Sequence, residues 1–330
     1  MHMRFTRITF SLFVVIAVSV IIGCGQKKSE SNASRTIVIG LVAKSQANVV
    51  FQAAHRGALD AARELGPSYG VKVEVRWMTP PEENPQRQAD AIEQLARSGV
   101  QGIAVSCSDA NILTPAIDKA VALGANVMCF DSDAPQSKRF CFFGTDDASC
   151  GKAVMSILAK EMNDAGPIAI LAGNQSAPNL QRRVTGVRDE LLKHPGMSLI
   201  PNGVYYHAET PEQAAETVNR AQSVNPSIRG WAMVGGWPLF TKGALKWPAG
   251  SVKVVSVDAL PPQLEYLESG HVQALLAQDC HGWGRRSVEI LLEKILRNAD
   301  PPQPRMQDSL VVVTKVNAAE YREKWRRWLE

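Results

Sequence analysis

Thr36-Ile-Val-Ile-Gly-Leu-Val42 is a continuous run of apolar and β-branched residues that contains no charge. A run without polar alternation is typical of a parallel strand that is covered on both faces of its sheet. The next segment, 50–65, carries apolar residues at helical spacing and leads to Gly66-Pro67, where we expect the helix to end. A covered strand joined to an amphipathic helix predicts an α/β fold.

Alternating strand and helix signals continue along the chain. In the first half we predict strands at 71–77, 102–106 and 126–130 and helices at 84–98 and 113–123. In the second half we predict helices at 147–163, 179–193, 211–224, 261–269 and 284–296 and strands at 168–171, 198–206, 230–234, 253–257, 272–277 and 309–316. This pattern predicts two doubly wound parallel sheets, with a ligand cleft where the carboxyl ends of their strands face each other.

Polar and aromatic side chains follow the ends of several predicted strands. The set is Asn48, Phe51, Asp131, Asp133, Arg183, Trp237, Asp258 and Gln278. Taken alone, each has a structural alternative: Asp258 could cap a helix, Arg183 could lie on a helix surface, and Phe51 could pack in the core. Their shared position at strand ends favours a common ligand-binding site.

These residue types suit a polyhydroxylated neutral ligand. Carboxylates and amides bond to vicinal hydroxyl groups, and a guanidinium group offers a planar fork of donors. Flat aromatic faces can cover the apolar C–H side of a sugar ring. The sequence therefore predicts a binding site for a sugar or polyol, without a cofactor or a metal.

The N-terminal segment has the features of an export signal. Arg4 and Arg7 precede an apolar stretch, 8–22, that is short for a membrane span of ~20 residues. The ending Ile21-Ile22-Gly23-Cys24 resembles the lipobox of bacterial lipoproteins, which implies a lipid on Cys24 and cleavage just before it. The polar segment 25–35 reads as a flexible tether. An uncleaved anchor helix and an ordinary signal peptide are the alternatives.

Composition excludes several classes of protein. The chain is 45% hydrophobic and 21% charged, as in ordinary globular proteins, and its net charge of +4 is too small and too evenly spread to indicate a nucleic-acid partner.

Cysteine spacings match no zinc pattern. Outside the leader, Cys141 and Cys150 are the first pair to test for a disulfide, whereas buried free thiols are at least as plausible for Cys107 and Cys129.

The order and spacing of these residues resemble a known family, the periplasmic sugar-binding proteins of ABC importers of the ribose/galactose type (class I), over 36–316. The resemblance is carried by Ile39-Gly-Leu-Val42 with Asn48 and Phe51, Gly57-Ala-Leu-Asp-Ala-Ala62 with Leu65-Gly66, Gly102-Ile-Ala-Val105, Asp131, Gly144-Thr-Asp146 with Gly151, Arg183 with Gly186, Val254-Val-Ser-Val-Asp258 and Ala277-Gln278. It implies two Rossmann-like lobes that close around a ligand and present it to a membrane permease.

The resemblance also implies a division of the chain. Three crossovers between the lobes are expected near Gly144–Thr145, Leu276–Asp279 and Met306–Ser309. The expected parts are a signal peptide at 1–24, a tether at 25–35, an N-terminal lobe at 36–144 with 279–306, and a C-terminal lobe at 145–278 with 307–330. We expect a monomer in the periplasm or cell envelope, anchored through Cys24.

Two departures from the family pattern concern the ligand. Ribose-type members follow the aspartate at the strand end with arginine, whereas this chain has Ser132-Asp133. Many members carry an asparagine–aspartate turn where this chain has Gly235-Gly236-Trp237-Pro238. The sequence therefore leaves open whether the ligand is a pentose other than ribose, a hexose or a sugar-derived signal.

Three other functions are compatible with the sequence to different degrees. A sensory receptor of the same fold, coupled to a membrane kinase or chemoreceptor, is the main alternative. An enzyme is disfavoured because the chain has no nucleophile elbow, no His-Glu-x-x-His and no Walker loop, and His281 is the one histidine expected near the cleft. A sugar-responsive repressor would need an N-terminal helix-turn-helix, where this chain has its export signal.

Overall fold

The computed structural model describes residue 2 and residues 35–329. The expected signal peptide apart from residue 2, the lipidation site Cys24, and all of the tether except Arg35 lie outside this part of the chain. Within it, no helix combines the length and the apolar character that crossing a membrane requires.

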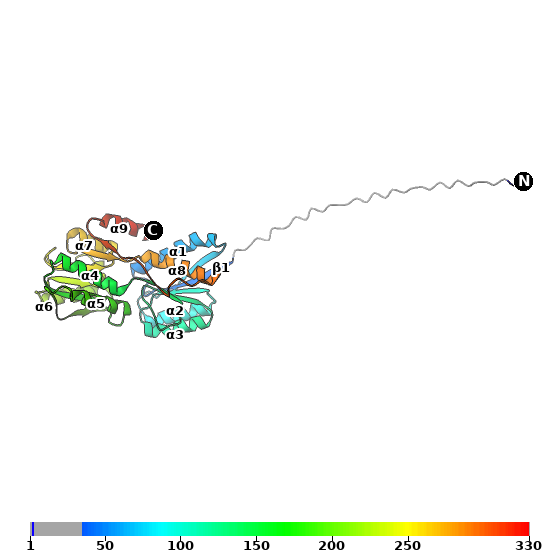
Figure 1. Ribbon diagram of the computed structural model, residues 1–330, viewed down its shortest axis with the longest axis horizontal. Helices are drawn as coiled ribbons and strands as arrows, with labels where there is room; N and C mark the ends of the chain where they lie inside the picture. The colour runs from blue at the N-terminus through cyan, green and yellow to red at the C-terminus, as the bar shows by residue number, and fades with distance from the viewer. Residues whose placement is uncertain (1, 3–34, 330) are drawn as a thin grey trace. The chain divides into compact units, whose positions relative to one another are not determined.

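The first lobe is built on a six-stranded parallel sheet (Figure 1). Its strand order is β11-β5-β4-β3-β1-β2. Its elements are β1 (Thr36–Val42), α1 (Val49–Ser68), β2 (Lys72–Trp77), α2 (Pro85–Arg97), β3 (Gly102–Val105), α3 (Ala110–Ala122), β4 (Asn126–Phe130), β5 (Cys141–Gly144), α8 (Cys280–Arg297) and β11 (Arg305–Gln307).

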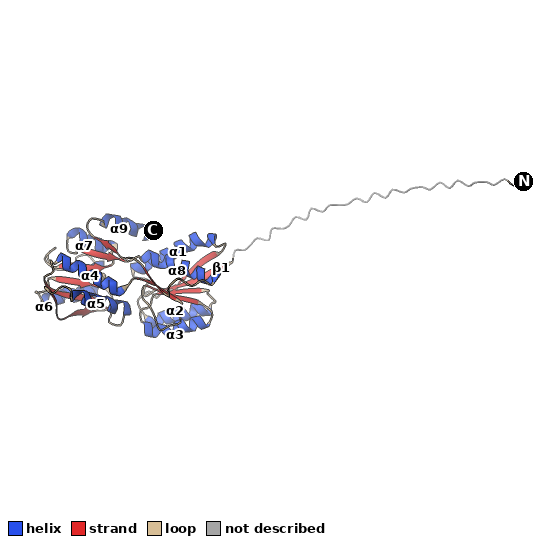
Figure 2. Ribbon diagram, viewed as in Figure 1, coloured by secondary structure: helices blue, strands red, loops and turns tan. Residues whose placement is uncertain are grey.

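The second lobe repeats the plan with the strand order β12-β10-β9-β8-β6-β7, in which only β12 is antiparallel to its neighbour. Its elements are α4 (Asp147–Glu161), β6 (Gly166–Gly173), α5 (Pro178–Leu191), β7 (Met197–Tyr206), α6 (Pro211–Val224), β8 (Gly230–Met233), the 3₁₀ turn η1 (Trp237–Phe240), β9 (Lys253–Val257), α7 (Pro261–Ser269), β10 (Ala274–Ala277), β12 (Val311–Val313) and α9 (Ala318–Leu329). Figure 2 shows helices on both faces of the sheets, which confirms the predicted doubly wound class.

The chain passes between the two sheets three times. It leaves the first sheet after Gly144, returns after Ala277, and leaves it again between Gln307 and Val311. These passages coincide with the crossovers expected from the sequence. The assignment of every residue range to one lobe or the other stays a prediction.

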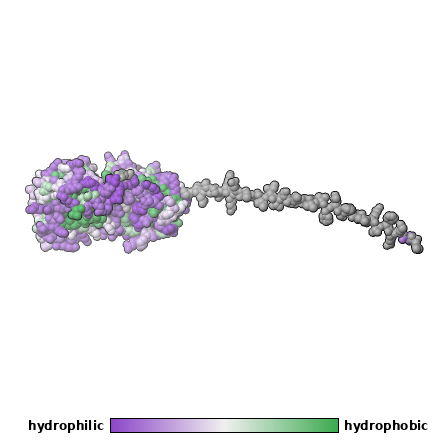
Figure 3. Space-filling model, turned by 90° about the horizontal axis from the view of Figure 1, so that it is seen from above, coloured by the Kyte–Doolittle hydropathy of each residue, from purple (hydrophilic) through white to green (hydrophobic). Residues whose placement is uncertain are grey.

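Apolar residues are concentrated in the interior of both lobes. The strands β3, β4, β8 and β10 are buried almost throughout, as expected of strands covered on both faces. Large exposed apolar side chains are scattered over several elements, and the face of the molecule in Figure 3 is mainly hydrophilic with small apolar areas.

Glycines allow one pair of helices in each lobe to pack at backbone distance. A Cβ atom on Gly284 of α8 would lie 1.7 Å from the carbonyl oxygen of Ala54 in α1. In the second lobe, a Cβ atom on Gly151 of α4 would lie 1.9 Å from the carbonyl oxygen of Arg183 in α5. Close packing of α4 on α5 therefore fixes the backbone that carries Arg183.

Some local predictions were wrong. The strands β5 and β11 were not predicted, because each is short and lies beside a crossover. The helix α1 continues past Gly66-Pro67, since a proline in the last turn removes only one hydrogen bond and Tyr69 N still donates to Leu65 O at 3.1 Å. The closing strand is shorter than predicted.

All five cysteines of the described region are buried free thiols. Cys141 lies in β5 and Cys150 in α4, so the disulfide suggested for this pair is not formed in the structure. Cys107 and Cys129 are close, with their Sγ atoms 3.9 Å apart, and agree with the buried-thiol alternative.

Candidate functional site

A cavity of about 850 Å³ lies between the loops at the carboxyl ends of the strands of the two lobes. Such loops are the usual ligand site of open parallel sheets. Seven of the eight residues predicted from the sequence line this cavity: Asn48, Phe51, Asp131, Arg183, Trp237, Asp258 and Gln278.

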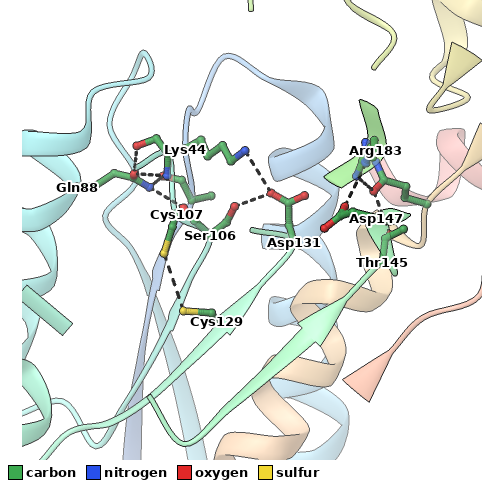
Figure 4. A network of polar contacts seen from close by, with 12 residues as sticks. Lys44, Gln88, Ser106, Cys107, Cys129, Asp131, Thr145, Asp147 and Arg183 are labelled. Atoms are coloured by element: carbon green, nitrogen blue, oxygen red, sulfur yellow. Dashed lines mark hydrogen bonds and ion pairs between the residues drawn. The ribbon is translucent and has the colours of Figure 1, made fainter. Parts of the chain in front are cut away.

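Arg183 is the best-anchored charged group of the cavity. It is 3% exposed and projects from α5, and Figure 4 shows it beside Asp147. Its Nε donates to Asp147 Oδ1 at 3.1 Å, its Nη1 to the Val234 carbonyl oxygen at 3.0 Å, and its Nη2 to Gln278 Oε1 at 2.7 Å. Three groups from different parts of the second lobe thereby fix the guanidinium plane.

Gln278 links Arg183 to Asp258 by hydrogen bonds. Its Oε1 accepts from both Thr145 and Arg183, so its Nε2 must point the other way, where it donates to Asp258 Oδ1 at 2.7 Å. Burial raises the pKa of Asp258 above its ordinary value, while Arg183 and Gln278 favour the ionised form. A fixed acceptor is thus presented to the cavity in a water-poor place.

Asp131 occupies the position in the first lobe that Asp258 occupies in the second. Its Oδ2 accepts from Ser106 Oγ at 2.6 Å and lies 3.9 Å from Lys44 Nζ, as Figure 4 shows. Asp131 and Asp258 directly follow β4 and β9, and both have left-handed backbones, with φ of 56° and 68°. Strained conformations of this kind concentrate at functional sites, where they aim a side chain.

Aromatic rings form the apolar part of the cavity. Phe51 from the first turn of α1, Trp237 from η1 and Trp283 from α8 all line it. Trp237 fits because Gly173 and Gly235 leave room for its ring, since a Cβ atom on either would lie 2.5 Å or less from the ring. The Gly-Gly-Trp-Pro departure therefore serves to place a large flat ring beside the ligand space.

Asp133 is not brought to the cavity. It is fully buried, and its carboxylate pairs with Arg139 at 2.5 Å and Arg305 at 3.0 Å. His281 also faces elsewhere: its Nε2 lies 3.0 Å from Asp60 Oδ2 and its ring stacks on Trp328, so the expectation that it lies near the cleft was wrong.

Several polar residues that line the cavity were missed from the sequence, among them Lys44, Glu83, Asn179 and Glu209. Lys44 comes two residues after β1 and Glu209 three residues after β7, so the strand-end criterion could have found both. Glu83 and Asn179 lie at helix starts, where polar residues are common for structural reasons. Nothing in the sequence marks these two.

Within residues 35–329 no group of three His, Cys, Asp or Glu residues could hold a metal ion. The cavity instead offers fixed acceptors, one fully anchored guanidinium group, a lysine and four aromatic side chains, since Phe240 lines it as well. This arrangement can bind a small donor-rich and acceptor-rich ligand by hydrogen bonds and ring stacking.

The environment of Glu83 predicts a pH-dependent stability. Glu83 is exposed at the cleft, yet the protein around its carboxyl group and the charges of Glu209 and Asp131 raise its pKa to about 7, although Lys44 opposes the shift. A carboxyl group with a raised pKa in the folded state stabilises the fold at low pH, and this benefit is lost as the pH rises from its ordinary value near 4.5 through 7.

We therefore expect the melting temperature of Glu83→Gln, relative to the parent protein, to rise between pH 4.5 and 7 and to level off above. Circular dichroism melts over this range measure the difference. Glu82→Gln removes the neighbouring carboxylate and should not reproduce the profile. Parallel pH profiles for the parent protein and Glu83→Gln would contradict the assignment.

Comparison with known proteins gives consistent matches. The family model described as "Periplasmic binding protein domain" matches residues 39–298. The D-ribose/D-allose-binding protein of Pseudomonas aeruginosa is 26% identical over 258 residues, which are 73% of this chain and 76% of that protein. The L-arabinose-binding periplasmic protein of Escherichia coli is 23% identical over 328 residues, covering 92% and 95% of the two chains.

A solved structure is similar over most of the chain. It is an ABC transporter solute-binding protein from Burkholderia graminis in complex with D-arabinose, with a TM-score of 0.78 and 26% identity. The match covers 87% of this chain and 98% of that one.

Proposed function

The chain belongs to the periplasmic binding protein domain family, whose members are substrate-binding proteins and not enzymes, and from this premise we propose that it captures a sugar or sugar-like polyol between its two lobes. The proposal rests above all on one observation. Seven residues chosen from the sequence as sugar contacts, from both halves of the chain, line one cavity.

The residues divide into two kinds of contact. Asp131 from the first lobe and Asp258 from the second offer carboxylates from opposite walls, so one ligand with several hydroxyl groups can satisfy both. Phe51 and Trp237 offer flat faces for the ring of the ligand. A ligand held by both lobes favours the closed form, because each wall contributes only when the lobes meet.

We further propose that the captured ligand is delivered to an ABC permease, and that a lipid on Cys24 keeps the periplasmic protein, a monomer, near that permease. The transport context is supported by the Burkholderia relative, which is named as an ABC transporter solute-binding protein. The relatives are named as binding or import proteins, which gives no support to the sensory-receptor alternative.

A ligand panel tests the proposal. Neutral pentoses, hexoses and polyols, together with their amino derivatives, are added at millimolar concentration in thermal-shift measurements. A ligand at a hundred times its Kd should raise the melting temperature by about 5 °C or more. The absence of a shift with every member of the panel, on protein with a cooperative melt, would contradict the proposed function.

A further inference from the structure

The charge of the cavity is unbalanced. Seven residues with carboxyl groups line it, against two basic residues, Lys44 and Arg183. Arg183 is already engaged with Asp147 and Gln278, and Lys44 lies nearest to Asp131. Neither base is therefore available to neutralise the remaining carboxylates in full.

Most of the carboxylates have a structural explanation. Asp131 and Asp258 are hydrogen-bonded by Ser106 and Gln278. Asp109 caps α3 by accepting from the backbone of Asn111 at 2.8 Å. Glu212 is exposed in the first turn of α6, where the helix dipole favours a negative charge. Glu82 and Glu83 are both exposed on the loop before α2, and Glu83 interacts electrostatically with Glu209 of the other lobe. Glu83 and Glu209 remain.

Glu83 and Glu209 belong to opposite lobes and influence each other electrostatically across the cleft. Within residues 35–329 neither side chain has an ion pair or a hydrogen bond, and Glu209 Oε1 is a buried acceptor without a partner. Lys44 is in electrostatic reach of both, but its single positive charge also serves Asp131.

Both carboxylates are carried by loops that are held in place. The loop before Glu83 is fixed by hydrogen bonds from Gln46 N to Pro80 O at 2.8 Å and from Ala47 N to Pro81 O at 3.2 Å. Before Glu209, the ring of His207 packs edge-on against Trp237 with centroids 5.0 Å apart. The backbone segments that carry the two carboxyl groups are thus held at the cleft.

A buried asparagine of the same cavity indicates which kind of ligand group fits beside these carboxyl groups. Asn179 is only 3% exposed and lines the same cavity, and its Oδ1 has no hydrogen-bond partner. Among the described residues that line the cavity, two buried side-chain atoms have no hydrogen-bond partner. They are Asn179 Oδ1 and Glu209 Oε1, and both are acceptors. These atoms suit a ligand group that donates hydrogen bonds. A hydroxyl group offers one donor, whereas an ammonium group offers three donors, no acceptor and a positive charge that also suits the two carboxyl groups.

We propose that the ligand carries a protonated amino group that lies between the carboxylates of Glu83 and Glu209, so that the substrate class is an amino sugar or an amino polyol. This inference rests on the proposed sugar-capturing function and narrows it. The sugar ring occupies the space between Asp131, Asp258 and the aromatic residues, and the amino group is held at the acidic pair.

The test uses matched pairs of ligands: D-glucosamine with D-glucose, D-galactosamine with D-galactose, and pentoses and hexoses aminated at each carbon in turn with their neutral parents. Affinities are measured by calorimetry above pH 7, where Glu83 is ionised. We expect at least one amino compound to bind about tenfold or more tightly than its parent.

Isosteric variants assign the preference to the two carboxylates. Glu83→Gln and Glu209→Gln should each reduce the preference for the amino compound about tenfold and leave the affinity for the neutral parent nearly unchanged. Glu216→Gln, on the exposed face of α6 outside the cavity, removes the same charge and should change neither affinity.

The possible results separate the two proposals. If neutral sugars bind and no aminated derivative binds more tightly, the amino-group inference is overturned while the sugar-capturing function stands. A preference that survives in both glutamine variants overturns the inference in the same way. If neither class of compound binds, the proposed function fails, and the inference fails with it.

Discussion

Replacing Asp258 by asparagine is expected to weaken ligand binding by about a hundredfold or more without unfolding the protein. The carboxylate is buried, held by Gln278 and presented to the cavity. Losing two hydrogen bonds between a charged acceptor and ligand hydroxyls costs about 3 kcal/mol, which corresponds to roughly two orders of magnitude in affinity. Calorimetric titration with the ligand found in the panel measures the effect.

Asparagine is the appropriate substitution because the backbone of Asp258 is left-handed, with φ of 68°. Asparagine tolerates this conformation, whereas Asp258→Ala would also introduce backbone strain. Asp133→Asn is the matched control, since Asp133 is also buried but pairs with Arg139 and Arg305 away from the cavity. It should lower stability and leave affinity unchanged. Unaltered affinity in Asp258→Asn would refute the site.

Replacing Arg183 by methionine is expected to abolish measurable binding and to lower the free energy of unfolding by about 3 kcal/mol. The variant removes the donor that orients Gln278 and leaves the buried Asp147 with one fewer partner. Breaking a buried ion pair costs about 3–5 kcal/mol, and the lower end applies because Arg182 still contacts Asp147 at 2.8 Å. Denaturant unfolding and calorimetry measure the two effects.

Arg182→Met provides the comparison for this prediction. Arg182 contacts the same carboxylate, but it is more exposed and does not line the cavity. Its loss should cost about 1 kcal/mol of stability and leave the ligand affinity as it was. Equal losses of affinity in the two variants would show that Arg183 acts only through Asp147 and not at the cavity.

The fold was predictable because its signals are local. The run Thr36–Val42 and its repeats mark covered strands, and strand ends gather at one edge of a parallel sheet whatever the packing details. A single strand-end rule therefore found Asp131, Asp258 and Gln278 without knowledge of their neighbours.

The same rule could not separate Asp131 from Asp133, which follow the same strand. Asp133 is held away from the cavity by Arg139, six residues further on, and by Arg305, which is distant in sequence and reaches Asp133 only when β11 pairs with β5. The juxtaposition of Glu83 and Glu209 likewise depends on the meeting of two lobes. Contacts between residues that are distant in the sequence are set by the tertiary structure, and a pattern along the chain does not predict them.

Native mass spectrometry of the parent protein and Asp258→Asn, each incubated with the sugar and amino-sugar panel, tests the central claim most directly. If the protein captures a sugar between its lobes through Asp258, the parent protein should carry one member of the panel at a ratio of one to one, and the variant should carry none under the same conditions. A parent protein that retains no member of the panel, or a variant that retains it equally well, would contradict the account.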